Sequence, residues 1–524
     1  MLAFATGTQH PKYLLVDCGV HMSQKYGRNY MRLVLDDLRR ATGGRLDYVV
    51  ATHEHDDHLS GFANFAEDFE SQKLSLNEVW LAWTEDDGDP AARRLKRSRR
   101  RALAALDATA RKLADSAATL GSEGLGFRAL ASRLDNIRQY FGEAPIPESR
   151  RASTADPAAG RGQAPSRTQR ALELLKRKAA ATRFLGPECA PIKFTGTNVR
   201  AYVLGPPRDE SMLKKSDPSS GPGKETYLTS AAGLDSFALA VAPDALAAGV
   251  GADTDASSFD IDSNRYNELN RHELCFPFGS AVGLDLATTD MERLAADGDH
   301  PYAAVAERYQ AEASRRIDDD WLYAADALAL NLDKHTNNTS LVLAFEIGTP
   351  GQGAVLLFAA DAQVGSWASW STKSWQIGRR NITSADLLRR TVVYKVGHHA
   401  SHNATLRQVD GREFGLPLMS DGVVGLIPVD QHTAEKLPGW DMPAPELYSA
   451  LRTKSRGNLL RSDDIDEHLT VPRRRWSDVP GAERLRWRAS RHEKSSGSPL
   501  YYEISVPVPT AGSRRLKKDV EDGK

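Results

Sequence analysis

The fold of this chain is decided by residues 46–58, which read Leu46-Asp47-Tyr48-Val49-Val50-Ala51-Thr52-His53-Glu54-His55-Asp56-Asp57-His58. A largely apolar run of strand type is followed at once by seven residues that hold three histidines and three carboxylates. Imidazole nitrogens and carboxylate oxygens are the usual ligands of zinc and similar divalent cations. Burying so many ionisable groups in one turn without partners would be costly. A pair of metal ions would hold them together and give them a use.

The segment before this stretch indicates an α/β pattern. Residues 11–19 are typical of a strand that ends in a glycine turn. Residues 28–40 have helix spacing and place four apolar side chains on one face, namely Met31, Val34, Leu35 and Leu38. Gly43-Gly44 ends that helix before the buried strand at 46–51. Strand, helix, strand and then a ligand-rich loop is the order expected of an α/β protein.

Residues 67–330 differ in character, and we interpret them as a largely helical insertion. Residues 91–142 are charged and alanine-rich, and their apolar residues recur at three- and four-residue steps. Residues 143–168 contain few apolar side chains and predict a disordered linker. A further helix is expected at about 168–184, and residues 191–245 predict a return to short strands.

A second α/β block follows the insertion. Apolar strands are predicted at 340–347, 354–360 and 391–396, and the last two end at Asp361 and at His398-His399. Residues of the types that bind metal ions therefore follow three separate predicted strands. Because sites in α/β sheets gather at the carboxyl ends of strands, these loops predict one shared site.

Composition narrows the class of protein. Lys plus Arg (68) nearly cancels Asp plus Glu (69), so the net charge of −1 gives no argument for a nucleic-acid or membrane partner. The three cysteines, Cys18, Cys189 and Cys275, are too scattered for a disulfide framework and suit a reducing cytosol. No signal segment is visible, and no apolar run approaches the roughly 18 residues of a membrane helix. We expect a cytoplasmic protein of two or three domains' length.

The motif His53-x-His55-x-Asp57-His58 after a strand resembles the signature of the metallo-β-lactamase fold. Three later stretches, Asn337 to Leu343, Leu356 to Asp361 and Lys395 to Ser401, are similar to the ComEC-type hydrolase domain branch of that superfamily. The resemblance covers roughly residues 1–66 and 335–455.

The resemblance implies a four-layer αβ/βα sandwich with two metal ions at one edge, bridged by water or hydroxide. It implies that His53 and His55 bind the first metal and that Asp57 and His58 bind the second. Asp361 would bridge the two ions, and Asp57 would also orient the hydroxide. The second site would be completed by one member of the doublet at 398–399.

Some ligand assignments stay open. The superfamily usually supplies another histidine before the bridging aspartate, and His335 is the leading candidate, with Asn338 and then His272 as alternatives. Between His398 and His399 we favour His398, because alternate residues of an extended chain face opposite ways. The relatives also begin with a Gly-x-Gly-Asp-like turn that this chain lacks, so either its start is late or its edge strand differs.

The expected domain organisation follows from the resemblance. Residues 1–66 and 331–509 are the two parts of one metallohydrolase domain, separated by the insertion at 67–330. Residues 510–524 form a charged tail.

The expected function is that of a hydrolase with two divalent metal ions, zinc first and manganese as an alternative. A phosphoester or phosphodiester substrate leads, and a small molecule with a lactam, lactone or thioester carbonyl is the runner-up, because the same metal pair would activate water against either. The alternative from another functional class is a non-catalytic scaffold protein that is stabilised by metal. The basic run Arg93 to Arg101 could contact a nucleic acid, although a solvated helix face is its default interpretation. The sequence does not predict an oligomeric state.

Overall fold

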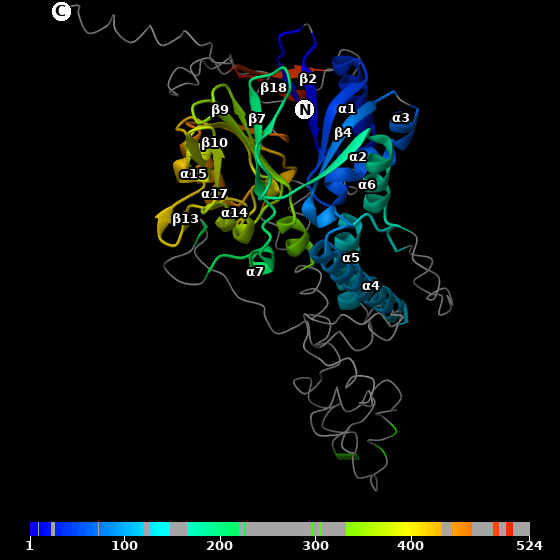
Figure 1. Cartoon of the computed structure of the whole chain (residues 1–524). Coiled ribbons are helices and arrows are strands. Elements are labelled where there is room, and N and C mark those ends of the chain that lie inside the picture. The colour runs from blue at the N-terminus through cyan, green and yellow to red at the C-terminus, as the bar shows by residue number, and fades with distance from the viewer. Residues whose placement is uncertain are drawn as a thin grey trace, which may run out of the picture.

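The computed structural model describes residues 1–8, 10–21, 27–71, 73–119, 125–146, 165–219, 225–226, 293, 296, 303–304, 332–431, 442–463, 486–491 and 499–506. Within these residues the protein is a mixed α/β fold with two large mixed sheets (Figure 1). This architecture agrees with the α/β class that the sequence predicts.

The first sheet has five strands in the order β1-β2-β3-β4-β5. They are β1 (Leu2–Phe4), β2 (Lys12–Val16), β3 (Arg45–Ala51), β4 (Ser75–Ala82) and β5 (Ala181–Leu185). Strand β1 is antiparallel to β2, and the other neighbours are parallel. The helices that connect these strands are α1 (Gly27–Thr42), α2 (Asp56–Asn64), α3 (Ala66–Glu70), η1 (Trp83–Glu85), α4 (Pro90–Thr119), α5 (Leu125–Tyr140) and α6 (Arg167–Lys178).

The second sheet has seven strands in the order β16-β15-β12-β9-β8-β7-β6. They are β6 (Ile192–Lys193), β7 (Val199–Gly205), β8 (Val342–Ile347), β9 (Ala354–Phe358), β12 (Thr391–Lys395), β15 (Val424–Ile427) and β16 (Leu459–Arg461). The strands from β9 to β16 are parallel, and those from β6 to β9 are antiparallel.

Shorter elements complete the described fold. The helices are α7 (Glu210–Lys214), α14 (Val364–Trp370), α15 (Ser384–Arg389), η5 (His398–Ala400), η6 (Leu416–Leu418) and α17 (Pro445–Lys454). Three two-stranded ribbons pair β10 (Ser374–Ile377) with β11 (Arg380–Thr383), β13 (Gln408–Val409) with β14 (Arg412–Glu413), and β17 (Arg486–Arg491) with β18 (Pro499–Ser505).

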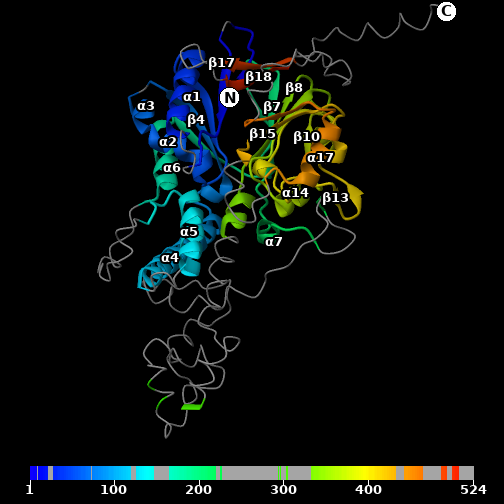
Figure 2. The same cartoon turned by 180° about the vertical axis from the view of Figure 1, so that it is seen from behind.

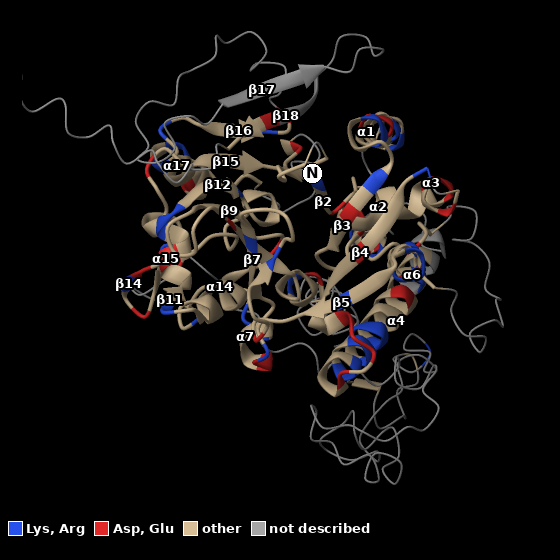
Figure 3. Ribbon diagram, turned by 45° about the horizontal axis from the view of Figure 1, so that its top comes forward, with Lys and Arg blue, Asp and Glu red and all other residues tan. Residues whose placement is uncertain are grey.

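Both faces of the central strands are buried, which explains their continuous apolar sequences. Successive side chains of a strand point to opposite faces. In β3, Val50 joins a core cluster that contains residues of both sheets, whereas Val49 joins a cluster with α1, α2 and α6. In β8, Phe345 joins the cluster between the sheets, whereas Ala344 joins a cluster with α14, α15 and α17. Figure 3 shows these two groups of helices on opposite sides of the molecule.

The helix predicted at 28–40 is confirmed as α1, and its expected apolar face is largely buried. Met31, Leu35 and Leu38 are buried, and Val34 packs half-buried against the same cluster. A side-chain stripe at this spacing packs on a sheet because residues three and four apart lie on one side of a helix.

The structure differs from the expected insertion at 67–330. Strands β4 and β5 lie inside this range and pair in the first sheet, while β6 and β7 pair in the second. The strands predicted near 192–204 are thus confirmed, but β4 and β5 were not expected. Both strands lie between helical segments. Strand β4 pairs with β3 and β5 pairs with β4, and this pairing decides their conformation. The predicted linker overlaps residues 147–164, which lie outside the described residues, as does the tail at 510–524.

Among the described residues of this region, the longest helices are α4, α5 and α6. Helices α4 and α5 pack on each other through a separate cluster that includes Leu106, Leu113, Leu134 and Ile137. Figures 1 and 2 show both helices at one end of the molecule, beyond the two sheets. None of the described helices is long and apolar enough to cross a membrane.

Candidate metal centre

The candidate site lies where strand ends of the two sheets meet. Strand β3 runs into Thr52 and the histidine-rich loop, and α2 begins at Asp56, so Asp57 and His58 occupy its first turn. Strands β9 and β12 are parallel neighbours, so the residues after them leave the sheet at the same edge. The backbone N–H of Leu341 donates to the carbonyl of Thr52 (2.8 Å) and ties the second sheet to the histidine loop.

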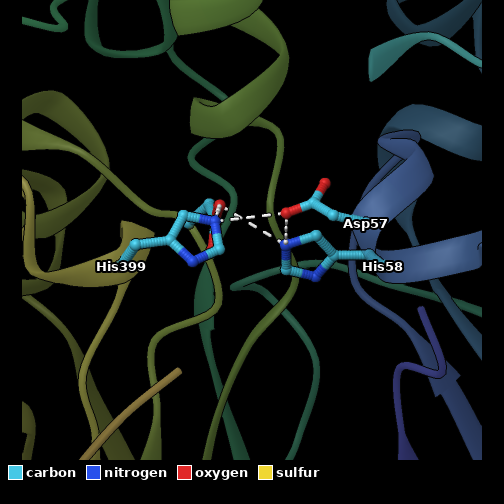
Figure 4. A group of neighbouring side chains, drawn as sticks. Asp57, His58 and His399 are labelled. Carbon is cyan, nitrogen blue, oxygen red and sulfur yellow. Dashed lines mark hydrogen bonds and ion pairs between the residues drawn. The ribbon is translucent and has the colours of Figure 1, made fainter. Parts of the chain in front are cut away.

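Four side chains from these loops form what we call the carboxylate–histidine cluster: Asp57, His58, Asp361 and His399. One ligand atom of each lies within 4.8 Å of the others (Figure 4). His399 Nε2 lies 3.1 Å from Asp57 Oδ2 and 3.7 Å from Asp361 Oδ2. His58 Nε2 lies 3.4 Å from Asp361 Oδ2 and 3.6 Å from Asp57 Oδ2. These nitrogen and oxygen donors can hold a metal ion.

His53 and His55 form a second pair of donors beside this cluster. His53 Nε2 lies 3.1 Å from His55 Nδ1, and the rings of His53 and His58 have centroids 4.2 Å apart. Both imidazoles are buried. Two nitrogens this close can point their lone pairs at one cation.

At His53, His58 and His399, the other ring nitrogen faces a hydrogen-bond acceptor of the protein. Asp17 Oδ2 accepts from His58 Nδ1 (2.8 Å), and Asp17 also accepts from the hydroxyl and the N–H of Thr52. The Thr52 hydroxyl oxygen accepts from His53 Nδ1 (3.1 Å), and the carbonyl of Pro428 accepts from His399 Nδ1 (2.6 Å). Such outer partners fix the imidazole tautomer and ring orientation that a metal ligand needs.

Burial and charge act in opposite directions on these groups. Burial would lower the pKa of His58, but Asp361, Asp57 and Asp17 outweigh it and raise that pKa well above its usual value. For Asp361, burial would raise the pKa of the carboxyl, but His58 and then His399 hold it well below its usual range. Burial dominates at His55, whose pKa falls to about 3. The cluster therefore contains charged pairs, while His53 and His55 stay neutral and able to bind a metal.

The centre fits a cation by a second criterion. Asp57 Oδ1 and His55 Nε2 are buried and make no hydrogen bond within the described protein. Buried polar atoms are nearly always satisfied, and a bound cation at this site would give both of these atoms a partner. Carboxylate and imidazole donors together suit zinc or manganese.

The structure corrects one expectation, because it places His399, and not His398, in the cluster. The ring of His398 instead contacts Ser401 Oγ (2.6 Å), Asn403 Oδ1 (3.1 Å) and Asn337 Nδ2 (3.2 Å). The prediction of His398 requires an extended chain at this point. Residues 398 to 400 have φ of 45°, 51° and 62°, so a left-handed turn reverses which side chain faces the site.

Backbone strain gathers at this centre. Among the described residues, seven non-glycine positions have positive φ, and five of them adjoin the site: Asp17, Ala360, His398, His399 and Ala400. Each costs about 1–3 kcal/mol, and such strain persists only where the surrounding structure enforces it. Its position next to the candidate ligands points to a functional requirement.

Neither His335 nor Asn338, the candidates for the intermediate ligand, belongs to the carboxylate–histidine cluster. His335 is exposed on a helical turn at 332–338. Asn338 instead donates to the carbonyls of Leu213 (3.1 Å) and Lys215 (3.0 Å). His272 lies outside the described residues.

Two carboxylates near the centre, Asp333 and Asp17, are not among the site residues predicted from the sequence. Asp333, on the same helical turn as His335, places Oδ1 3.7 Å from His55 Nε2, and burial followed by Asp57 raises its pKa to about 7. Asp17 follows β2 as Asp361 follows β9. The rule that polar residues gather after strands applies equally to Asp17 and could have found it, whereas Asp333 follows no strand.

The comparisons with known proteins agree with this geometry. Residues 11–130 match the family model of the Metallo-beta-lactamase superfamily. The matched region contains His53, His55, Asp57 and His58, whereas Asp361 and His399 lie outside it. No curated protein and no solved structure is significantly similar to the chain.

The placement of the 398–399 doublet generates one prediction. His399→Ala should reduce bound zinc by about one ion per chain or weaken its affinity at least about tenfold, because the variant loses a donor of the cluster. His398→Ala should retain the wild-type zinc content, since its ring faces Ser401 and Asn403. Zinc content after dialysis, measured by plasma emission spectrometry, checks both. Loss of zinc in His398→Ala alone would reverse the assignment.

Metal binding should also release protons. His58 and His399 have raised pKa values in the metal-free protein, because neighbouring carboxylates outweigh burial at both. They are protonated below those values and must lose the proton to become ligands. Zinc affinity should therefore rise as the pH increases from about 6 to about 8. Calorimetric titration in buffers of different ionisation enthalpy counts the protons, and pH-independent binding without proton release would contradict the cluster's role.

Proposed function

We propose that this protein is a metal-dependent hydrolase. The observation that carries the proposal is the convergence of Asp57, His58, Asp361 and His399 from loops of both sheets. His53 and His55 would hold a first divalent cation, and the cluster would hold a second, with Asp361 between them. The match of residues 11–130 to a superfamily composed mostly of hydrolases supports this reading.

The proposed architecture is the four-layer αβ/βα sandwich. Its support is the arrangement of three core clusters: one contains residues of both sheets, and each of the other two joins one sheet to its own helices. We further propose the ComEC-type branch, because the three stretches that resemble it contain the start of β8, the end of β9 and the turn after β12. All three of these segments border the candidate site.

Several chemical roles follow from the side chains. When bound, divalent cations supply Lewis-acid polarisation of the scissile bond and lower the pKa of water enough to provide a nucleophile at neutral pH. Asp57 is held through Oδ2 by His399, while its Oδ1 is buried and makes no hydrogen bond within the described protein. Asp57 Oδ1 can therefore accept a proton from a water molecule and orient it. Asp17, Thr52 and Pro428 keep the imidazoles in the required tautomers.

A phosphoester or phosphodiester is the proposed substrate. Helix α4 begins 40 residues before the end of the family match and carries exposed arginines at positions 93, 94, 97, 100 and 101. Figure 3 shows Lys and Arg gathered along α4. Arg99 of this helix contacts Glu54 in the histidine loop, so α4 passes next to that loop. Arginine suits phosphate because its donors match phosphate oxygens in pairs.

A substrate panel tests the proposal. Zinc- or manganese-loaded protein should hydrolyse bis-p-nitrophenyl phosphate, and Asp57→Asn should lower kcat about 10²- to 10⁴-fold, because the variant loses a positioned proton acceptor. The variant Asp36→Asn, at an exposed carboxylate of α1, serves as the control and should keep the wild-type rate.

The same panel contains a chromogenic β-lactam, a lactone and a thioester. Turnover of one of these carbonyl substrates by a protein inert toward phosphodiesters would overturn the substrate ranking. Stoichiometric metal without turnover of any substrate would favour the scaffold interpretation.

A further inference from the structure

Two carboxylates of the histidine loop do not face the cluster. Glu54 and Asp56 alternate with His53, His55 and Asp57, and both are buried. His55 has an extended backbone, with φ −113° and ψ 150°. Because alternate side chains of an extended segment face opposite ways, Glu54 points away from its neighbours His53 and His55. Asp56, the first residue of α2, contacts Arg167 and not the cluster.

Each of the two acids contacts an arginine that is distant in sequence. Arg167 forms a two-pronged ion pair with Asp56, with Nε 2.7 Å from Oδ1 and Nη2 2.6 Å from Oδ2. Arg99 Nη2 contacts Glu54 Oε2 and lies 3.6 Å from Glu85 Oε1. We call these contacts, Arg99 with Glu54 and Arg167 with Asp56, the arginine clamp.

Both arginines come from helices outside the two sheets. Arg99 lies on α4, and Arg167 is the first residue of α6, whose start is fixed by a Ser166 capping box. Residues of this helical region also contact the ligand side of the loop, since the ring of Phe141, directly after α5, lies edge-on to His55 with centroids 4.9 Å apart. The helical region therefore holds the histidine loop from two sides.

The clamp is well suited to fixing the loop backbone. The Asp56 side chain is 0% exposed and that of Arg167 is 16% exposed, so solvent screens this pair weakly. A paired guanidinium and carboxylate also fix each other's orientation, which a single point charge does not. Because Glu54 and Asp56 are each covalently adjacent to two candidate ligands, restraining them restrains His53, His55 and Asp57.

We propose that Arg99 and Arg167 are positioning residues of the metal centre, through which α4 and α6 pre-organise the histidine loop for its cations. This inference rests on the proposed function, because it requires the metal centre. Neither arginine touches the cluster in the described contacts, so their effect on metal binding is transmitted through Glu54 and Asp56.

Zinc affinity and the visible spectrum of the cobalt-substituted protein test the clamp. Arg167→Met should weaken zinc binding by about 10- to 100-fold and change the cobalt absorption bands, because the loop loses its fixed geometry. The double variant Asp56→Asn with Arg167→Met removes both charges, so it should recover part of that affinity. Arg177→Met, also on α6, is the control. It removes an exposed ion pair with Glu70 of α3 and should leave zinc affinity and the cobalt bands at wild-type values.

A second set of variants keeps the test decisive if the methionine variant does not fold. Arg167→Lys retains the charge but loses the two-pronged contact with Asp56. Arg99→Lys retains the charge but loses the guanidinium that contacts Glu54. Both variants should show a weaker form of the same loss. Wild-type zinc affinity and cobalt bands in these variants, with only the melting temperature lowered, would overturn the clamp while leaving the proposed function intact. A wild-type protein that binds neither zinc nor cobalt would overturn both.

Discussion

The structure depends on packing four ionisable side chains, two buried and two half-buried, against one another where the two sheets meet. Unpaired, Asp57 and Asp361 would be costly to bury, and so would a charged His58 or His399. Together they offset each other's charge, with nitrogen-to-oxygen distances of 3.1 to 3.7 Å. The same arrangement that makes this burial tolerable also gathers metal-binding atoms. Folding and function are therefore linked at this one point.

The rest of the architecture serves to keep that cluster in place. Parallel strands β9 and β12 deliver Asp361 and His399 to one edge, and β3 delivers the histidine loop from the other sheet. Left-handed backbone at residues 398 to 400 turns His399 inward. Helices α4 and α6 hold the far side of the loop through the arginine clamp. The helical region, whose role the sequence left open, thus has a definite place beside the candidate centre.

Much of this arrangement follows from sequence, and the exceptions have physical causes. The histidine loop and Asp361 could be predicted because each follows an apolar strand and carries ligand-type residues. His399 lies in the cluster because of a local left-handed turn, and the residue types at 398–400 do not predict such a turn. Asp333 and Arg167 reach the loop only through tertiary packing, from a helical turn and a helix whose positions the sequence does not fix. Strands β4 and β5 are likewise decided by their pairing and not by their own periodicity.

The most direct test is a crystal structure of the zinc-loaded protein with anomalous scattering measured at the zinc edge. An anomalous peak should lie among Asp57, His58, Asp361 and His399, with ligand distances of about 2.0 to 2.2 Å. A second peak should lie at His53 and His55. A well-ordered structure that shows these side chains and places zinc elsewhere, or holds none, would contradict the central claim.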